Sequence, residues 1–329
     1  GGVCFILTRM HFKLPETPKR RCMVGIVSLY IKMVLFIGLS MKKHLKKIGQ
    51  YTVDITFLLC MLVTAWFAMQ VFLLASFKIP SDSMEPGLTT GDNILVWKPT
   101  IGPRIFNLFA SMRNEQTEIY RIPGFKKIKR NDILVFNFPH PNNWDKIEMH
   151  ILKYYIKRCI GLPGDTLSIQ KGFFHVNGVS TPLGNMESQK QIARTDRFGD
   201  GIYNSFPYDS IMSWNIKDFG PLYIPGKGDS ITLDQKNYRF YKKLIEWEQQ
   251  GKLQYKASTA ILKGNPINGY RFLKNYYFMA GDNGMNSQDS RYWGLLPEEY
   301  IVGKAWIIWK SVDPYTEKYR WDRFLKVIH

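Results

Sequence analysis

A run of 23 residues without a charged side chain, from Ile55 to Phe77, constrains the fold of this chain more than any other feature of its sequence. A transmembrane helix needs about 20 consecutive apolar residues, whereas the apolar core of a cleaved leader is only about 7–15 residues long. The length of the run therefore predicts a membrane span over residues 55–77. Basic residues flank it on the N-terminal side, at Lys42, Lys43, Lys46 and Lys47. Because cytoplasmic flanks are rich in Lys and Arg, we expect residues 1–54 to be cytoplasmic and everything after Phe77 to lie outside.

An earlier apolar stretch, residues 23–41, is less suited to a membrane. It carries Lys32 near its middle, which costs about 2.5–3.5 kcal/mol on the insertion scale. A two-span hairpin would also place five preceding basic residues outside, against the usual charge bias: Arg9, Lys13, Lys19, Arg20 and Arg21. Met41 followed by two lysines is typical of a chain start, so we expect residues 1–40 to be an upstream extension without a role. The alternative is a genuine first span at 23–41.

The formal net charge of +18 has three interpretations: nucleic-acid binding, contact with anionic lipid, or a solvated basic surface. The sequence contains no module that reads nucleic acid, so we expect no such partner, and the lysines beside the apolar run favour the lipid bilayer. Apolar residues make up 45% of the chain and aromatic residues 15%, which excludes a disordered chain. The cysteines form no CxxC pair and no HExxH-like spacing occurs, so we expect no metal, no cofactor and no disulfide framework.

Beyond Phe77 the sequence consists of short apolar runs separated by Gly, Pro, Asn and Asp, which is typical of antiparallel β structure. Asn177-Gly178 predicts a hairpin turn, and helix-like spacing predicts a helix over 234–250. We therefore expect residues 78–329 to form one extracytoplasmic β domain with an inserted mixed subdomain at about 180–270. The predicted strands are Ile94–Trp97, Ile133–Phe138, Thr166–Ile169, Phe173–Val176, Tyr276–Ala280 and Ile301–Trp309.

A polar turn, residues 80–86, follows the predicted span and contains Ser83. Most serines in such turns only satisfy backbone groups, but a serine just outside the bilayer can meet a substrate that is held in the membrane. A serine nucleophile also needs a base. The histidines after the span lie in no distinctive setting, whereas Lys157 lies among aromatic and aliphatic residues, where burial can lower its pKa. In a strand, Tyr155, Lys157 and Cys159 share one face. The local sequence by itself favours a structural lysine.

Four segments in a fixed order resemble the characteristic boxes of bacterial type I signal peptidases (leader peptidases), which use a serine/lysine dyad. The framework around them covers about residues 77–309. The resemblance implies an antiparallel β fold shared with self-cleaving repressor peptidases. The matching segments are the nucleophile box Ile79–Pro86, the structural strand box Arg130–Phe136, the lysine box Lys157–Asp165 and the last box Gly281–Gly294.

The resemblance implies a role for each residue that matches a catalytic position. Ser83 is the expected nucleophile and Lys157 the expected general base. Ser81 is expected to supply a hydroxyl to the oxyanion hole beside the Ser83 backbone N–H, and Ser287 to orient the lysine ammonium. Neutral Lys157 then takes the Ser83 proton as Oγ attacks the carbonyl after a small residue, and water later hydrolyses the acyl-enzyme with the same lysine as base.

The resemblance also implies a structural ion pair between Asp289 and Arg291. The sequence departs from the family pattern in three places. Asp82 stands where the family often has Gly, Gly284-Met285 replaces an Arg-Asp, and residues 101–129 add basic and aromatic material. We expect shallow pockets for small residues before the cut, lined by Phe77, Met84, Tyr155 and Ile156.

Together these features predict a peptidase of the inner membrane, with its catalytic domain on the outer, periplasmic side, that removes signal peptides from exported preproteins. Contact with the export machinery is compatible with this role. One alternative is a catalytically silent, membrane-anchored β module that binds exported chains and needs neither Ser83 nor Lys157. The other is a dedicated processing peptidase with narrow targets, which the sequence does not separate from the general enzyme because substrate range depends on pocket shape and loops.

Overall fold

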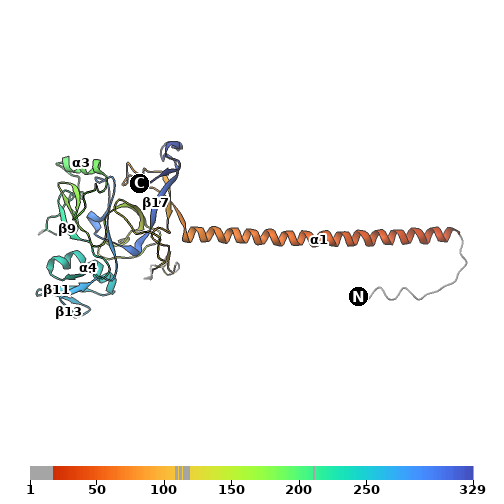
Figure 1. The fold of residues 1–329 in the computed structure, drawn as a ribbon, viewed down its shortest axis with the longest axis horizontal. Helices are drawn as coiled ribbons and strands as arrows, with labels where there is room; N and C mark the ends of the chain where they lie inside the picture. Colours follow the sequence, from red (N-terminus) through yellow and green to blue (C-terminus); the bar gives the residue numbers. More distant parts are fainter. Residues whose placement is uncertain (1–17, 108–109, 111–112, 114–118, 210–211, 329) are drawn as a thin grey trace. The chain divides into compact units, whose positions relative to one another are not determined.

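The structure, a computed structural model, describes residues 18–107, 110, 113, 119–209 and 212–328 (Figure 1). The chain divides into two compact units, Gly1–Phe67 and Ala68–His329. The first contains most of helix α1, and the second contains the last turn of α1 and all the β structure. The first 17 residues of the expected N-terminal extension lie outside the described residues.

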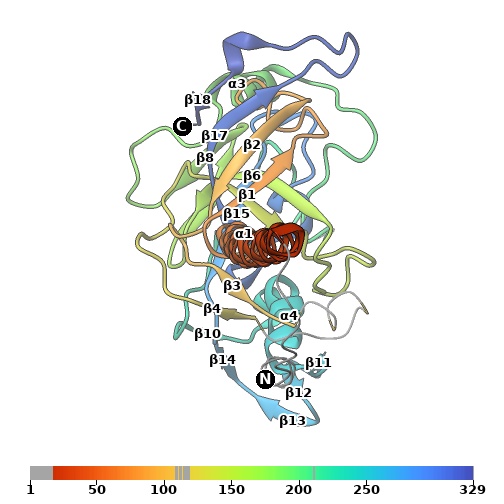
Figure 2. The same ribbon diagram turned by 90° about the vertical axis from the view of Figure 1, so that its right-hand side faces the viewer.

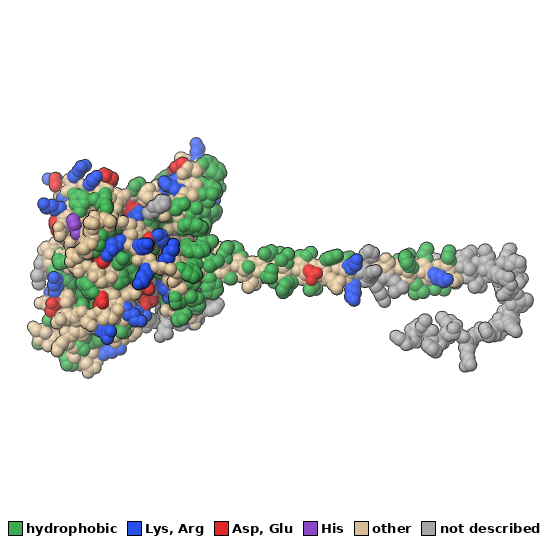
Figure 3. All heavy atoms as spheres, viewed as in Figure 1, with side chains coloured by type: hydrophobic (Ala, Val, Ile, Leu, Met, Phe, Trp, Pro, Cys, Tyr) green, Lys and Arg blue, Asp and Glu red, His purple; other side chains and the backbone are tan. Residues whose placement is uncertain are grey.

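Helix α1 runs from Pro18 to Phe72 without interruption. Of the described residues, one helical segment is long and apolar enough to cross a membrane by its length and composition, Lys46–Phe72, with a mean hydropathy of 2.0. Figure 3 shows hydrophobic side chains over the described part of the helix on both sides of a charged segment. The earlier apolar stretch, residues 23–41, belongs to the same continuous helix, so the described chain makes no hairpin between the two apolar stretches.

The predicted end of the span is wrong by five residues, because the helix ends at Phe72 and strand β1, Leu74–Lys78, follows at once. Apolar composition continues through Phe77 in both elements, and hydropathy does not distinguish a helix from a strand. Lys98 closes the helix end: its Nζ donates to the carbonyl of Gln70 at 2.6 Å and to that of Val71 at 3.1 Å. These carbonyls have no partner within the helix, so the lysine satisfies them.

The main sheet contains eight antiparallel strands in the order β1-β2-β17-β5-β6-β15-β16, with β18 paired to β17 (Figures 1 and 2). The expected strands at 94–97, 133–138, 276–280 and 301–309 are confirmed within it. After β1 its strands are β2 Asp92–Trp97, β5 Ile133–Asn137, β6 Tyr154–Gly161, β15 Tyr276–Ala280, β16 Leu296–Pro297, β17 Ile301–Ser311 and β18 Lys326–Val327.

Strand β5 is buried along its whole length, which shows that the main sheet has an apolar layer on each face. Leu134 and Phe136 belong to the larger core cluster, which continues into the inserted part of the chain. Ile133 and Val135 point the other way, into a smaller cluster with Met84, next to Ser83, and residues of β2 and β17. A near-continuous apolar run such as ILVF is what a strand buried on both faces requires.

The chain leaves the main sheet after Gly161 and returns at Tyr276. This inserted part begins earlier than the expected residue 180, because β7 and β8 pair with β9 in a separate sheet. Its elements are β7 Thr166–Gln170, β8 Phe173–Val176, α3 Met186–Arg194, β9 Phe219–Tyr223, β10 Ser230–Thr232, α4 Gln235–Gln249, β11 Leu253–Lys256, β12 Thr259–Leu262, β13 Asn265–Ile267 and β14 Gly269–Arg271.

Two local predictions in the inserted part had different outcomes. The helix expected over 234–250 is confirmed as α4, which is capped by the Asp234 side chain and ends with Gln250 in the left-handed conformation. The hairpin expected at Asn177-Gly178 is wrong. Strand β8 pairs with the strand before it, β7, through a turn at Lys171-Gly172 in which both residues have positive φ. Asn-Gly still forms a turn, but the chain after it continues to α3 instead of a strand.

Five smaller elements complete the described chain. The two-stranded ribbon of β3 and β4 lies in the basic segment 101–129, and its arginines donate to backbone carbonyls near Tyr300. The short helix α5 follows the last box. The bounds are β3 Arg104–Ile105, β4 Tyr120–Arg121, α5 Ser290–Trp293, and two 3-10 turns, η1 Glu298–Tyr300 and η2 Trp321–Arg323.

Candidate active site

Ser83 lies in a tight turn that the main sheet holds from both ends. One residue beyond the end of β1, the Ile79 N–H still donates to the Asp92 carbonyl of β2, at 2.8 Å. After the serine, Met84 and Leu88 are completely buried, and the Leu88 N–H donates to the Met84 carbonyl at 2.9 Å. These apolar anchors fix the turn, so the serine between them has a defined position.

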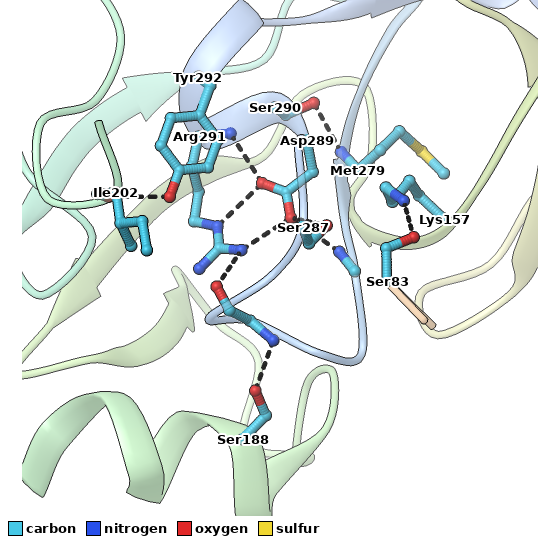
Figure 4. A network of polar contacts seen from close by, with 12 residues as sticks. Ser83, Lys157, Ser188, Ile202, Met279, Ser287, Asp289, Ser290, Arg291 and Tyr292 are labelled. Carbon is cyan, nitrogen blue, oxygen red and sulfur yellow. Dashed lines mark hydrogen bonds and ion pairs between the residues drawn. The ribbon is translucent and has the colours of Figure 1, made fainter. Parts of the chain in front are cut away.

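Lys157 lies in the middle of β6, opposite Leu134 of β5. Its Nζ lies 2.6 Å from Ser83 Oγ, although the two residues are 74 positions apart in the sequence (Figure 4). Only 3% of Lys157 and 8% of Ser83 is exposed to solvent. The fold therefore brings a buried amine and a buried hydroxyl into hydrogen-bonding contact.

Burial lowers the pKa of Lys157 to about 8. The nearby carboxylates of Asp289, Asp282 and Asp82 act in the opposite direction, and Arg291 adds to the lowering. A lysine with an ordinary pKa near 10.4 is almost entirely protonated at neutral pH. With a pKa near 8, about a tenth of the lysines are neutral at pH 7, which is enough for the amine to accept a proton from the serine.

The two expected supporting serines lie in different surroundings. Ser81 is exposed, and its Oγ lies 3.4 Å from Ser83 Oγ. Ser287 is buried, and its Oγ donates to Asp289 Oδ2 at 2.7 Å. Among the described residues, Ser287 makes no hydrogen bond to Lys157, so its expected role in orienting the lysine stays a prediction.

Asp289 and Arg291 form a buried ion pair next to the dyad, with Nη2 to Oδ2 at 2.8 Å and Nε to Oδ1 at 2.8 Å (Figure 4). The same carboxylate accepts hydrogen bonds from the Gly281 N–H and from Ser287. Gly281 is required here, because an added Cβ would collide with Ser287 Oγ and lie 2.6 Å from the Ser83 carbonyl. The ion pair thus holds the loop of residues 281–287 against the turn that carries Ser83.

The four expected pocket residues divide between two clusters. Phe77, Met84 and Ile156 belong to the smaller core cluster, where Met84 is fully buried. Tyr155 points to the other face of β6, stacks on Phe138 at 4.4 Å between ring centroids, and lies with its ring 5.7 Å from Lys157 Nζ. Their role in binding the residues before the cut stays a prediction.

Two groups of polar contacts that hold these segments together were not predicted from the sequence. Arg158, next to the lysine, forms a two-point ion pair with Asp282, with both N–O distances 2.7 Å. Asp82 accepts hydrogen bonds from the side chain of Asn286 at 3.0 and 2.9 Å and from that of Asn283 at 3.3 Å. All of these charged and amide residues lie in the four segments that resemble the family boxes, so the sequence did contain a signal for these contacts.

A neutral amine that accepts a proton from a serine hydroxyl can generate a nucleophile without a histidine. In the described part of the chain, no three His, Cys, Asp or Glu side chains are grouped as a metal ion would require. The contact between the buried amine and the serine hydroxyl is suited to acyl transfer through the serine oxygen.

Comparison with known proteins places this geometry in a family. The family model of signal peptidase, peptidase S26, matches residues 50–310. Signal peptidase I of Buchnera aphidicola subsp. Acyrthosiphon pisum is 32% identical over 255 residues, which cover 76% of this chain and 72% of that protein. Signal peptidase I of Pseudomonas aeruginosa is 30% identical over 254 residues, which cover 74% of this chain and 67% of that protein. This chain therefore belongs to the signal peptidase family, peptidase S26.

Proposed function

We propose that this protein removes signal peptides from preproteins, with Ser83 as nucleophile and Lys157 as general base. The chain is a serine endopeptidase by family. The observation that carries the assignment of the dyad is the 2.6 Å contact between Lys157 Nζ and Ser83 Oγ at a site nearly closed to solvent. A structural lysine would be expected to reach solvent or a carboxylate. This one contacts a neutral hydroxyl.

The reaction would proceed through an acyl-enzyme. Neutral Lys157 accepts the hydroxyl proton while Ser83 Oγ attacks the carbonyl carbon of the scissile bond, and the resulting ammonium donates that proton to the leaving amine. Lys157 then activates a water molecule, whose attack releases the signal peptide from Ser83. No cofactor takes part in these steps.

The tetrahedral intermediate would be stabilised by the Ser83 backbone N–H and by the hydroxyl of Ser81. Each donor of an oxyanion hole typically contributes about 10²–10³ in rate. The exposed position of Ser81 supports this role, since its side chain is free to turn toward a bound substrate. The substrate residues before the cut would lie against Phe77, Ile156 and Tyr155, with Met84 beneath them.

The apolar segment of α1 would anchor the enzyme in the inner membrane, with the catalytic unit on the periplasmic side. The lysines that precede this segment support that orientation. The surface of the catalytic unit supports contact with the lipid bilayer, because exposed aromatic side chains suit a membrane interface. These side chains belong to Trp306, Trp309 and Trp321. Preproteins that carry signal peptides are the substrates, and contact with the export machinery is compatible with this location.

The full chain, purified in detergent and incubated with a purified exported preprotein, tests the activity. Mass spectrometry of the products should show one cut after a small residue, and Ser83→Ala should give none. An uncut preprotein would favour the silent binding module instead. Protease added to inverted membrane vesicles should spare the chain after Phe77, whereas protease added to spheroplasts should reach it. The reverse pattern would contradict the periplasmic orientation.

A further inference from the structure

Helix α3 of the inserted part meets the loop of residues 281–287 at Gly284. The Gly284 N–H donates to Ser188 Oγ at 2.6 Å, although the two residues are 96 positions apart (Figure 4). The carbonyl of the same glycine accepts from Arg291 Nη2 at 3.0 Å. Gly284 therefore connects the inserted helix to the buried ion pair of Arg291 and Asp289.

The same loop reaches the nucleophile one residue earlier. The N–H of Asn283 donates to the Ser83 carbonyl at 3.1 Å. A displacement of Gly284 would thus be transmitted to Asn283, its chain neighbour, and to the backbone of the serine. The path from Ser188 to Ser83 contains two hydrogen bonds and one peptide bond.

Ser188 lies in the first turn of α3, which several hydrogen bonds hold in place. Its own N–H donates to Asn185 Oδ1, the cap of α3, at 3.0 Å. The next residue, Gln189, is 3% exposed, and its side chain bonds to the Phe174 N–H at 2.8 Å and to the Leu183 carbonyl at 2.7 Å. These contacts attach the first turn of α3 to β8, so the serine hydroxyl is presented from a fixed position.

The close approach of helix and loop depends on the absence of a side chain at residue 284. An added Cβ would lie 2.7 Å from Ile192 Cδ1 and 2.8 Å from Ser188 Oγ. Ile192 is itself 2% exposed and has little freedom to move. Glycine at this point therefore lets α3 contact the loop directly.

We propose that Ser188 is a positioning residue for the dyad, which acts through Gly284 to hold the loop of residues 281–287 against Ser83. The proposal rests on the proposed catalytic roles of Ser83 and Lys157. It gives the inserted part of the chain a role in the reaction in addition to its contribution to the core.

The first test is Ser188→Ala in the full chain, with kcat and KM measured for cleavage of a purified preprotein. Loss of the hydroxyl leaves the Gly284 N–H without its acceptor and loosens the geometry of the reacting groups. We expect kcat to fall about tenfold and KM to stay within about twofold, since Ser188 is not expected to touch the substrate. Ser230→Ala, the same substitution at an exposed site of the inserted part, should leave both constants unchanged.

Leu222→Ala separates positioning from stability. Leu222 in β9 is fully buried, so this variant should lower the melting temperature more than Ser188→Ala does, yet keep nearly all of kcat. If kcat instead followed the melting temperature across the three variants, Ser188 would be structural and the proposal wrong.

A double-mutant cycle with Gly284→Ala identifies the contact. Both substitutions break the same contact, so the double variant should have the kcat of the worse single variant, whereas independent effects would multiply and contradict the proposal. Should Ser188→Ala fail to fold, Gly284→Ala gives the kcat and KM measurement from the other side of the contact.

Ser83→Ala separates this inference from the proposed function. If Ser83→Ala is inactive while Ser188→Ala equals wild type, only this inference fails. If Ser83→Ala is active, the proposed function fails.

Discussion

The dyad and the Asp289–Arg291 pair are both almost completely removed from water, yet burial has opposite consequences for them. Lys157 contacts a neutral hydroxyl, so nearby carboxylates offset the loss of solvation only in part and its pKa falls to about 8. Burial also opposes the charges of the ion pair. There, however, each group lies against an opposite charge, which holds the pKa of Asp289 below its usual value and that of Arg291 above it.

The comparison shows that the partner, more than the degree of burial, decides whether a buried group stays charged. The Asp289–Arg291 pair keeps both charges and contacts the loop of residues 281–287 at three positions. The amine of the dyad is left poised between charged and neutral states, which is the condition for a general base. Neighbouring buried sites would thus serve two purposes under the proposed function, one for order and one for proton transfer.

The largest expected effect is on activity when the dyad is broken. Ser83→Ala and Lys157→Met should each reduce cleavage by at least about 10³-fold, because each removes a reacting group. Neither should lower the melting temperature, since neither opens a large cavity and Lys157→Met removes a poorly solvated amine. Product formation and thermal unfolding are measured on the same preparations. Either variant retaining more than a few per cent of activity would contradict the assignment.

The ion pair should show the opposite response, with a large loss of stability. Arg291→Met leaves a buried carboxylate without its partner, which typically costs about 3–5 kcal/mol and lowers the melting temperature of a unit of this size by roughly 10 °C. Lys190→Ala is the matched control, because it breaks an exposed ion pair with Glu187 and should leave the melting temperature unchanged. If the two substitutions had equal effects, the distinction between the centres would fail.

The activity should depend on pH through Lys157. The amine is a base only when neutral, so kcat/KM should be constant above its pKa and fall about tenfold per pH unit below it. The midpoint of this acid limb is expected near pH 8, the pKa that burial gives to the lysine. A limb near the pKa of an exposed lysine, or one that disappeared with a histidine substitution, would show that Lys157 is not the base.

The smallest expected effect concerns Asp82, whose carboxylate raises the pKa of Lys157 slightly and so opposes burial. Asp82→Asn keeps the shape of the side chain and removes its charge, so the acid limb should move to lower pH while the plateau of kcat/KM is kept. Asp196→Asn, at an exposed site in the inserted part, should leave the limb in place. A shift of the Asp82→Asn limb to higher pH would contradict the electrostatic explanation.

The sequence predicted local elements well where the pattern depended on neighbouring residues. Helix α4 matches because Asp234 supplies the cap, and strand β15 matches because apolar residues continue through it. The choice of Lys157 as base did not follow from these patterns, which favoured a structural lysine. It required the resemblance of four segments, since no local feature relates Lys157 to a serine 74 positions away.

Other features could not be predicted because they depend on long-range packing. The end of α1 lies inside an apolar run, and only pairing with β2 makes Leu74–Lys78 a strand. The contact of Gly284 with Ser188 joins residues 96 positions apart, and it is visible only once α3 is seen against the loop. Likewise Asn177-Gly178 forms a turn as expected. The strand that pairs with β8, however, is β7, which precedes it, and this pairing depends on the arrangement of the whole sheet.

The junction of α1 and β1 has a kinetic consequence. A single residue, Leu73, separates the last helical residue from the strand that leads into the nucleophile turn, and Lys98 closes the helix end. An enzyme tethered by a long flexible linker searches a volume for its substrate, and its effective concentration falls as the linker lengthens. Here ten residues at most separate the helix end from Ser83. With α1 anchored in the bilayer as proposed, encounter with a membrane-held preprotein would become a search in two dimensions, governed by lateral diffusion in the bilayer.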